Sequence, residues 1–221
     1  MFHHIADRRT QISESVRARA SRESATARAV LADVLTLVET AQLVQTVLRE
    51  GFPATSFAVR VAKSEHGTQL SIDWTDGPRD VQVARLVMPL QATRLADGGR
   101  VERVEHFMLT SSGRQTVRLA ADRIALSRQF SDRAIERALA RLASRYGDRL
   151  APDVRAAMTV DGYRAGDLQL LEVIGVHRAG SLRSGSNVQM DVAAMLAEAS
   201  DVHGFPRSAT AARLFVRRDV H

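Results

Sequence analysis

Four arginines recur at every fourth position between residues 132 and 146. They are Arg133, Arg137, Arg141 and Arg145, and Arg149 stands four residues further on. Side chains four residues apart lie on the same side of an α-helix, so the guanidinium groups would form a row about 18 Å long. A guanidinium group binds phosphate oxygens bidentately. The spacing predicts a surface for the phosphate backbone of a nucleic acid; the alternative is a solvated basic face in an arginine-rich protein.

The helix that would carry this row is predicted by its two ends and its inner face. Ser131 is placed to cap the first turn, and Gly147 is placed to end the last one. Like charges at this spacing repel by about 0.2–0.5 kcal/mol per pair, so the row does not help an isolated helix. The face opposite the arginines is apolar, with Ile135, Ala138, Leu139, Leu142 and Tyr146.

The carboxylates near Trp74 are a weaker candidate for function than the arginine row. Asp73 and Asp76 flank Trp74, the only tryptophan, but alternation along a strand puts Asp73 on the opposite face from Trp74. No His or Lys lies nearby in sequence to complete an acid–base pair. We expect Asp76 to accept hydrogen bonds from backbone N–H groups or to cap the next helix, and Trp74 to be a core anchor. No catalytic residue is assigned, and the chain is interpreted as a non-enzyme.

Metal and cofactor chemistry is not indicated by the sequence. The seven histidines are scattered without metal-ligand spacing, and there is no cysteine to supply a thiolate or a disulfide. Neither a phosphate-binding loop nor a dinucleotide-binding glycine motif is present. We therefore expect no metal and no cofactor, and the absence of cysteine fits a cytoplasmic protein.

Composition and charge narrow the class of partner. The net charge is +6, and Lys63 is the only lysine among 31 basic residues. This charge favours nucleic acid or an acidic protein partner and argues against a mimic of DNA, which should be acidic. No run of about 18 apolar residues is present, so no membrane-spanning helix is expected.

The elements before the arginine row follow from hydrophobic periodicity. Residues 3–50 read as helix, and an apolar stripe from 27 to 48 ends before Gly51 and Pro53. Alternation at residues 57–62 and 70–75, around a polar loop, predicts a β-hairpin. A helix then follows Pro78, with a buried face expected at Val81, Ala84, Leu86, Val87 and Leu90. Residues 96–100 read as a turn, and strands are expected at 101–110, 115–120 and 124–130.

The remaining chain reads as a smaller region. We expect a strand at 168–176, a helix at 188–199 and a strand at 212–217. The whole is α+β, a mainly antiparallel sheet packed against amphipathic helices. The predicted division is a helical N-terminal arm at 1–37, an α+β domain at 38–147 and a small α/β C-terminal region at 148–221.

Residues 42–79 also carry the motifs of a known family. They read Phe52-Pro53, then Phe57-Ala58-Val59-Arg60, then Gly67, and then Ile72-Asp73-Trp74-Thr75-Asp76-Gly77-Pro78. This pattern resembles the large polyvalent protein-associated domain of the twenty-ninth class, over residues of about 38–147. Residues 121–132 give a second, looser match, whereas 90–106 depart from the family pattern. The resemblance implies a phage or conjugative element as the setting, and no catalytic residue carries over.

These observations together favour a nucleic-acid-binding accessory protein of a mobile element. It would contact phosphates without strong sequence specificity and would protect foreign DNA or counter host defence. The alternative is a protein-interaction module or inhibitor that binds an acidic surface of a host defence complex. In that case the apolar stripe at 27–48 would form part of a partner surface or a homodimer.

Overall fold

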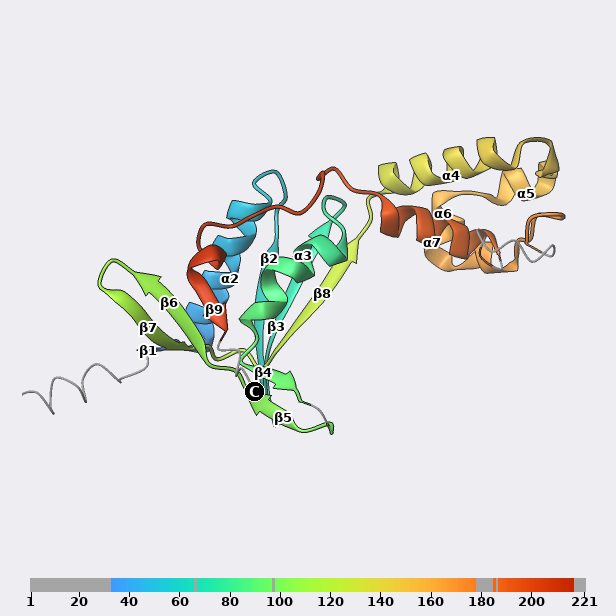
Figure 1. The fold of residues 1–221 in the computed structure, drawn as a ribbon. Coiled ribbons are helices and arrows are strands. Elements are labelled where there is room, and N and C mark those ends of the chain that lie inside the picture. The colour runs from blue at the N-terminus through green and yellow to red at the C-terminus, as the bar shows by residue number, and fades with distance from the viewer. Residues whose placement is uncertain (1–32, 66, 97, 178–184, 186, 217–221) are drawn as a thin grey trace, which may run out of the picture.

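The protein is an α+β structure in which two groups of elements each surround a core of their own (Figure 1). The computed structural model describes residues 33–65, 67–96, 98–177, 185 and 187–216. Three sheets are present in these ranges, and antiparallel pairs outnumber parallel ones. The predicted fold class is therefore confirmed, while residues 1–32 of the predicted N-terminal arm lie outside the described residues.

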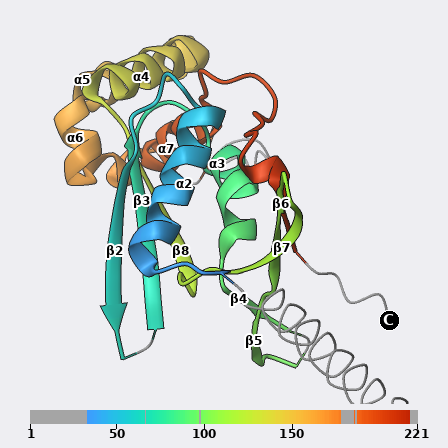
Figure 2. The same ribbon diagram turned by 90° about the vertical axis from the view of Figure 1, so that its left-hand side faces the viewer.

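The centre of the first group is a three-stranded sheet with the order β2-β3-β8. Strands β2 (Ala58–Ser64) and β3 (Gly67–Thr75) form the predicted hairpin, and β8 (Arg123–Gln129) pairs in parallel with β3. Alternation along β3 turns Leu70, Ile72 and Trp74 inward, where they are buried against the helices. Helices α2 (Leu37–Gly51) and α3 (Asp80–Val87) cover this face (Figure 2).

Helix α2 begins later than the apolar stripe predicts. Thr36 caps it: its hydroxyl accepts from the Glu39 N–H, and the Glu39 carboxylate accepts from the Thr36 N–H at 2.7 Å, which is a capping box. Residues Asp33–Val34 form strand β1 instead, paired in parallel with β7. The expectation of helix at 33–36 is therefore wrong, because the capping box fixes the first turn. Val44, Val47 and Leu48 are buried in the protein's own core and form no free partner surface.

The residues after α3 form two further sheets. A short 3-10 helix η1 (Met88–Leu90) leads to the hairpin of β4 (Thr93–Leu95) and β5 (Val101–Arg103). Strands β6 (His106–Thr110) and β7 (Gly113–Arg118) lie in a four-stranded sheet with the order β1-β7-β6-β9. The single strand predicted at 101–110 is thus two strands with different partners.

The phase of α3 also differs from the prediction. Val81 is 54% exposed, whereas Gln82 and Val83 are buried. The Gln82 side chain donates to the carbonyl oxygens of Val202 and Gly204 at 2.9 and 2.7 Å. Gln82 is therefore buried although the apolar pattern assigns Val81 to the inner face, because the carbonyls of residues 202 and 204 satisfy its amide.

The second group is helical and contains the predicted basic helix. Its elements are α4 (Asp132–Tyr146), η2 (Gly147–Arg149), α5 (Pro152–Ala157), α6 (Val160–Ala165), η3 (Asp167–Leu170) and α7 (Val188–Glu198). We call these elements the helical unit. The buried side chains of α4 pack here with Leu168, Val188 and Val192. The strand expected at 168–176 is wrong, because Asp167–Leu170 closes as a 3-10 turn after Gly166. The predicted division of the chain into domains stays a prediction.

The chain returns from the helical unit to the first group through residues 199–213, here called the strap (Figure 1). Glu50 at the end of α2 accepts from the Ser208 hydroxyl at 2.6 Å and from the Thr210 N–H at 2.9 Å. The strap ends in η4 (Ala211–Arg213) and leads into strand β9 (Leu214–Val216), which pairs with β6. The helical unit is therefore inserted between β8 and the strap. Among the described residues, no helix has the length and apolar character needed to cross a membrane.

Candidate nucleic-acid interface

The start of α4 is fixed by Asp76, which lies in the turn after Trp74. Asp76 has a positive φ of 56°, and Gly77 follows with 61°. The Asp76 carboxylate accepts from the Ser131 N–H at 2.9 Å and from the Ser131 hydroxyl at 2.5 Å. Ser131 in turn caps α4 by accepting from the Ala134 N–H. Asp76 thus accepts a hydrogen bond from a backbone N–H, as expected. The helix whose cap it holds is α4 rather than α3.

The arginine row lies on the solvent side of α4, as the sequence predicts. Arg133, Arg137, Arg141 and Arg145 are all exposed, and none forms an ion pair or hydrogen bond with a described residue. Four residues exceed one helical turn by about 40°, so the row slants around the helix by about 120° from first to last. Arg149 lies past the end of α4, in η2, and does not continue the helical row.

The acidic residues beside the arginine row on α4 do not neutralise it. Asp132 at the first turn pairs with Arg164 of α6 at 2.5 Å, and Arg164 also donates to the Phe130 carbonyl. Glu136 is exposed on α4 and forms no ion pair with a described residue. The arginines therefore remain available to an external anion.

A cleft opens beside the row, between α4 and the end of α7. Its volume is about 630 Å³. Arg137 and Arg141 line it from α4, and Phe130, Ala134, Ala138 and Met195 add apolar surface. We call it the α4–α7 cleft.

Arg128 holds the inner end of this cleft together. Its guanidinium donates to the carbonyls of Asp76 and Gly77, both at 2.9 Å, and to that of Ala199 at 2.8 Å. Longer contacts at 3.4 and 3.5 Å reach the carbonyls of Leu196 and Ala197. The cation therefore sits at the negative end of α7 and joins it to the Asp76 turn. Burial lowers the pKa of Arg128, and the charges of Asp80 and Asp76 oppose that shift.

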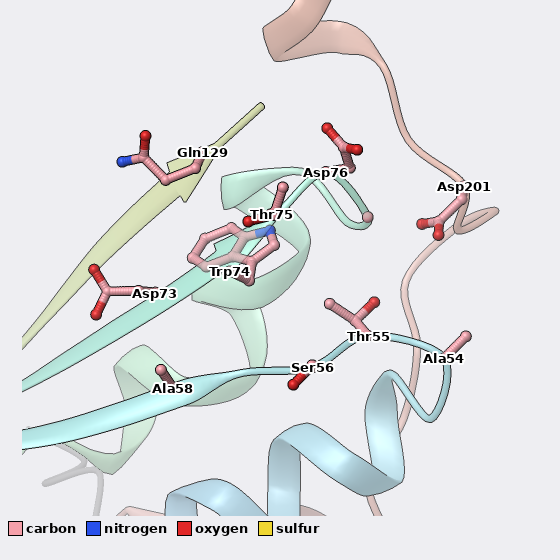
Figure 3. Close-up of a pocket in the computed structure, with 11 residues that line it drawn as sticks. Ala54, Thr55, Ser56, Ala58, Asp73, Trp74, Thr75, Asp76, Gln129 and Asp201 are labelled. Carbon is pink, nitrogen blue, oxygen red and sulfur yellow. The ribbon is translucent and has the colours of Figure 1, made fainter. Parts of the chain in front are cut away.

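A second cavity of about 450 Å³ lies on the other side of the Asp76 turn (Figure 3). Asp73 and Trp74 line it from β3, with Gln129 from β8 and Asp201 from the strap. Asp73 pairs with Arg60 at 2.7 Å, and the carboxylate of Asp76 is engaged by Ser131. Trp74 is 3% exposed, and its indole N–H donates to the Pro78 carbonyl at 3.0 Å, which confirms it as a core anchor. This arrangement offers no catalytic pair.

The core behind α4 contains a buried polar network. The Tyr146 hydroxyl donates to Asp191 at 2.8 Å, and the same carboxylate oxygen lies 3.5 Å from His177 Nε2. His177 Nδ1 accepts from the Val173 N–H at 2.8 Å, which places the ring proton on Nε2. Burial raises the pKa of Tyr146, and its hydrogen bond to Asp191 adds to the shift. The network fixes the inner face of α4 while the outer face carries the arginines.

The sequence predicted the arginines of the row but missed the residues that surround them. Asp201 lies in no motif. Arg128 and Phe130 lie in the looser family match at 121–132, which assigns them no role, and Arg128 is held by backbone carbonyls that any sequence supplies. Within the described ranges, no group of three or more His, Asp or Glu side chains is placed to hold a metal ion. The histidines of residues 1–32, together with His66 and His221, lie outside those ranges.

Comparison with known proteins identifies one part of the chain. Neither a curated protein nor a solved structure matches the chain. Residues 35–131 match the family model described as large polyvalent protein associated domain 29. The predicted resemblance is confirmed, and the match ends at the cap of α4, short of residue 147. The match associates this segment with polyvalent proteins. Residues 35–131 are therefore similar to large polyvalent protein associated domain 29.

Proposed function

We propose that this protein binds the phosphate backbone of nucleic acid through the arginine row of α4, as a non-enzymatic accessory protein of a mobile element. The observation that carries the proposal is the set of exposed arginines Arg133, Arg137, Arg141 and Arg145, which have no partner among the described residues. Four positive charges over about 18 Å match the close spacing of phosphates along a duplex. Contacts of this kind position a protein without reading sequence.

The family setting supports a role with foreign DNA. The matched segment is a domain of polyvalent proteins, and the basic helix begins where that match ends. Asp76, inside the match, accepts from the Ser131 N–H, and Ser131 caps the start of α4. We propose that the family domain is the scaffold and the helical unit is the binding element, and that the protein protects incoming DNA or counters host defence.

Binding is tested by fluorescence anisotropy of the full chain with duplex DNA, single-stranded DNA and RNA, at about 50 and 200 mM salt. The test variant is Arg137→Glu/Arg141→Glu. The matched control is Arg100→Glu/Arg123→Glu, which makes the same charge change at exposed arginines on β8 and beside β5. Circular dichroism confirms that each variant is folded.

We expect the affinity for duplex DNA to fall steeply as the salt concentration rises. The slope of the logarithm of the binding constant against the logarithm of the salt concentration should become shallower by about 0.9 for each phosphate contact removed. The α4 variant should lose most of the affinity, and the control should keep most of it. Absence of binding at low salt, or equal losses in the two variants, would refute the role of α4. A protein partner with an acidic surface would then become the leading candidate.

A further inference from the structure

The α4–α7 cleft is built differently from the arginine row beside it. The row is open and basic, whereas the cleft has an apolar floor of Phe130, Ala134, Ala138 and Met195. Its volume of about 630 Å³ lies within the range of about 300–1,000 Å³ that is usual for sites of small ligands. The cleft therefore has room and apolar surface for a group attached to the anion that the arginines bind.

Three side chains at the cleft can make new polar contacts. Arg137 and Arg141 have no partner among the described residues. Asp201 forms no hydrogen bond or ion pair with a described residue, although its charge interacts with that of Arg128. The other polar groups are engaged: Arg128 by five carbonyls, Asp76 by Ser131, and Ser200 by Gln82. The free groups are thus two cations at the α4 wall and one carboxylate that can accept from an N–H donor.

We infer that the α4–α7 cleft receives one unpaired nucleotide of the strand that follows α4. Arg137 and Arg141 hold its phosphate, the base lies on the apolar floor, and Asp201 accepts from the amino or ring N–H of the base. This inference rests on the proposed function and adds to it a preference for strand ends and single-stranded junctions.

A base-paired nucleotide does not satisfy the same contacts. Its faces are covered by neighbouring bases and its amino group is engaged in pairing, so a base must leave the stack to enter a pocket. That cost is smallest where the base is already unpaired. The arginine row continues past the cleft in both directions along α4, so the duplex part of a junction would remain on the row.

The test compares a blunt DNA hairpin with the same hairpin carrying a short 3′ overhang that contains 2-aminopurine. Affinity is measured by anisotropy, and the fluorescence of 2-aminopurine reports stacking of the unpaired base. Ala134→Phe fills the cleft and leaves every arginine in place. Ala140→Phe is the matched control, since Ala140 is exposed on α4 and does not line the cleft.

We expect the hairpin with the overhang to bind at least about fivefold more tightly than the blunt hairpin. Fivefold is about the smallest gain in affinity that one stacked base provides. The 2-aminopurine signal should change on binding. Both effects should disappear in Ala134→Phe and persist in Ala140→Phe. If Ala134→Phe does not fold, the 2-aminopurine signal of the wild-type protein decides.

Equal affinity for the two hairpins, or an unchanged 2-aminopurine signal, would overturn the inference and leave the proposed function intact. No binding to either hairpin would overturn both. A further arm adds dAMP: if free dAMP binds and the overhang gives no preference, the cleft is a mononucleotide site and the inference is wrong.

Discussion

Replacement of Asp76 tests how the family domain holds the basic helix. Asp76 combines a left-handed backbone, with φ of 56°, and a carboxylate that accepts two hydrogen bonds from Ser131. The variants Asp76→Asn, Asp76→Gly and Asp76→Ala remove these two contributions in different combinations. Asn keeps one acceptor oxygen and tolerates positive φ, Gly keeps only the backbone freedom, and Ala keeps neither.

The expected magnitudes follow from these contributions. Loss of the acceptor leaves the half-buried Ser131 N–H without its partner, which costs about 1–3 kcal/mol. A left-handed alanine costs about 1–2 kcal/mol more. We expect the free energy of unfolding to fall by about 1 kcal/mol for Asn, about 2 for Gly and about 3–4 for Ala. The test depends on the order of these losses, smallest for Asn and largest for Ala, rather than on their absolute values.

The assay is urea unfolding followed by the fluorescence of Trp74, the only tryptophan, which is buried two residues before Asp76. Circular dichroism at 222 nm, a wavelength dominated by helix, follows α4 and the other helices in the same samples. Equal losses for Gly and Ala would show that the positive φ is not strained. A stable Asp76→Ala protein would show that Ser131 does not depend on this carboxylate, and the account of how α4 is held would be wrong.

Three further changes probe the contacts around the site. Arg128→Lys should lower the free energy of unfolding by about 2–3 kcal/mol, because lysine cannot reach the carbonyls of the Asp76 turn and of α7 together; Arg123→Lys, exposed on the same strand, should be neutral in the same urea titration. Tyr146→Phe removes a hydrogen-bond donor from the buried Asp191 and should lower the free energy of unfolding by about 1–3 kcal/mol. Tyr163→Phe is the control, because the Tyr163 hydroxyl has no hydrogen-bond partner among the described residues, and it should leave the free energy of unfolding nearly unchanged. Hydrogen bonds from Ser208 and Thr210 lower the pKa of Glu50 below its ordinary 4.5, so this carboxylate stabilises the folded protein above that pH and the effect is lost as the pH falls through the lowered pKa. The urea midpoints of wild type and Glu50→Gln should therefore differ at pH 7 and converge in acid; a constant difference would contradict the assignment.

Local signals in the sequence predicted the elements that depend on neighbouring residues. The alternation before and after the polar loop gave the β2–β3 hairpin, and Ser131 gave the start of α4. The residues at 168–176 were misread, because a short apolar run has the same appearance in a strand and in a 3-10 turn. Val34 was assigned to a helix because its spacing fits the stripe, yet it pairs with β7.

Long-range partners account for the rest of the difference. Nothing local indicates that β9 pairs with β6, or that Gln82 is buried because the strap supplies its hydrogen bonds. The arginine row was visible because its members share one helix. The cleft was not visible, because its walls come from α4, α7 and the Asp76 turn, which meet only in the folded protein.

The return of the strap sets an order of events during synthesis. Strand β6 is made before the helical unit, but its partner β9 is made after it. Until β9 leaves the ribosome, one edge of β6 has unpaired N–H and C=O groups, which can pair with another chain. The helical unit, whose buried cluster is separate from that of the first group, is made in that interval. Late closure of the sheet makes the nascent protein most prone to aggregation just before β9 arrives.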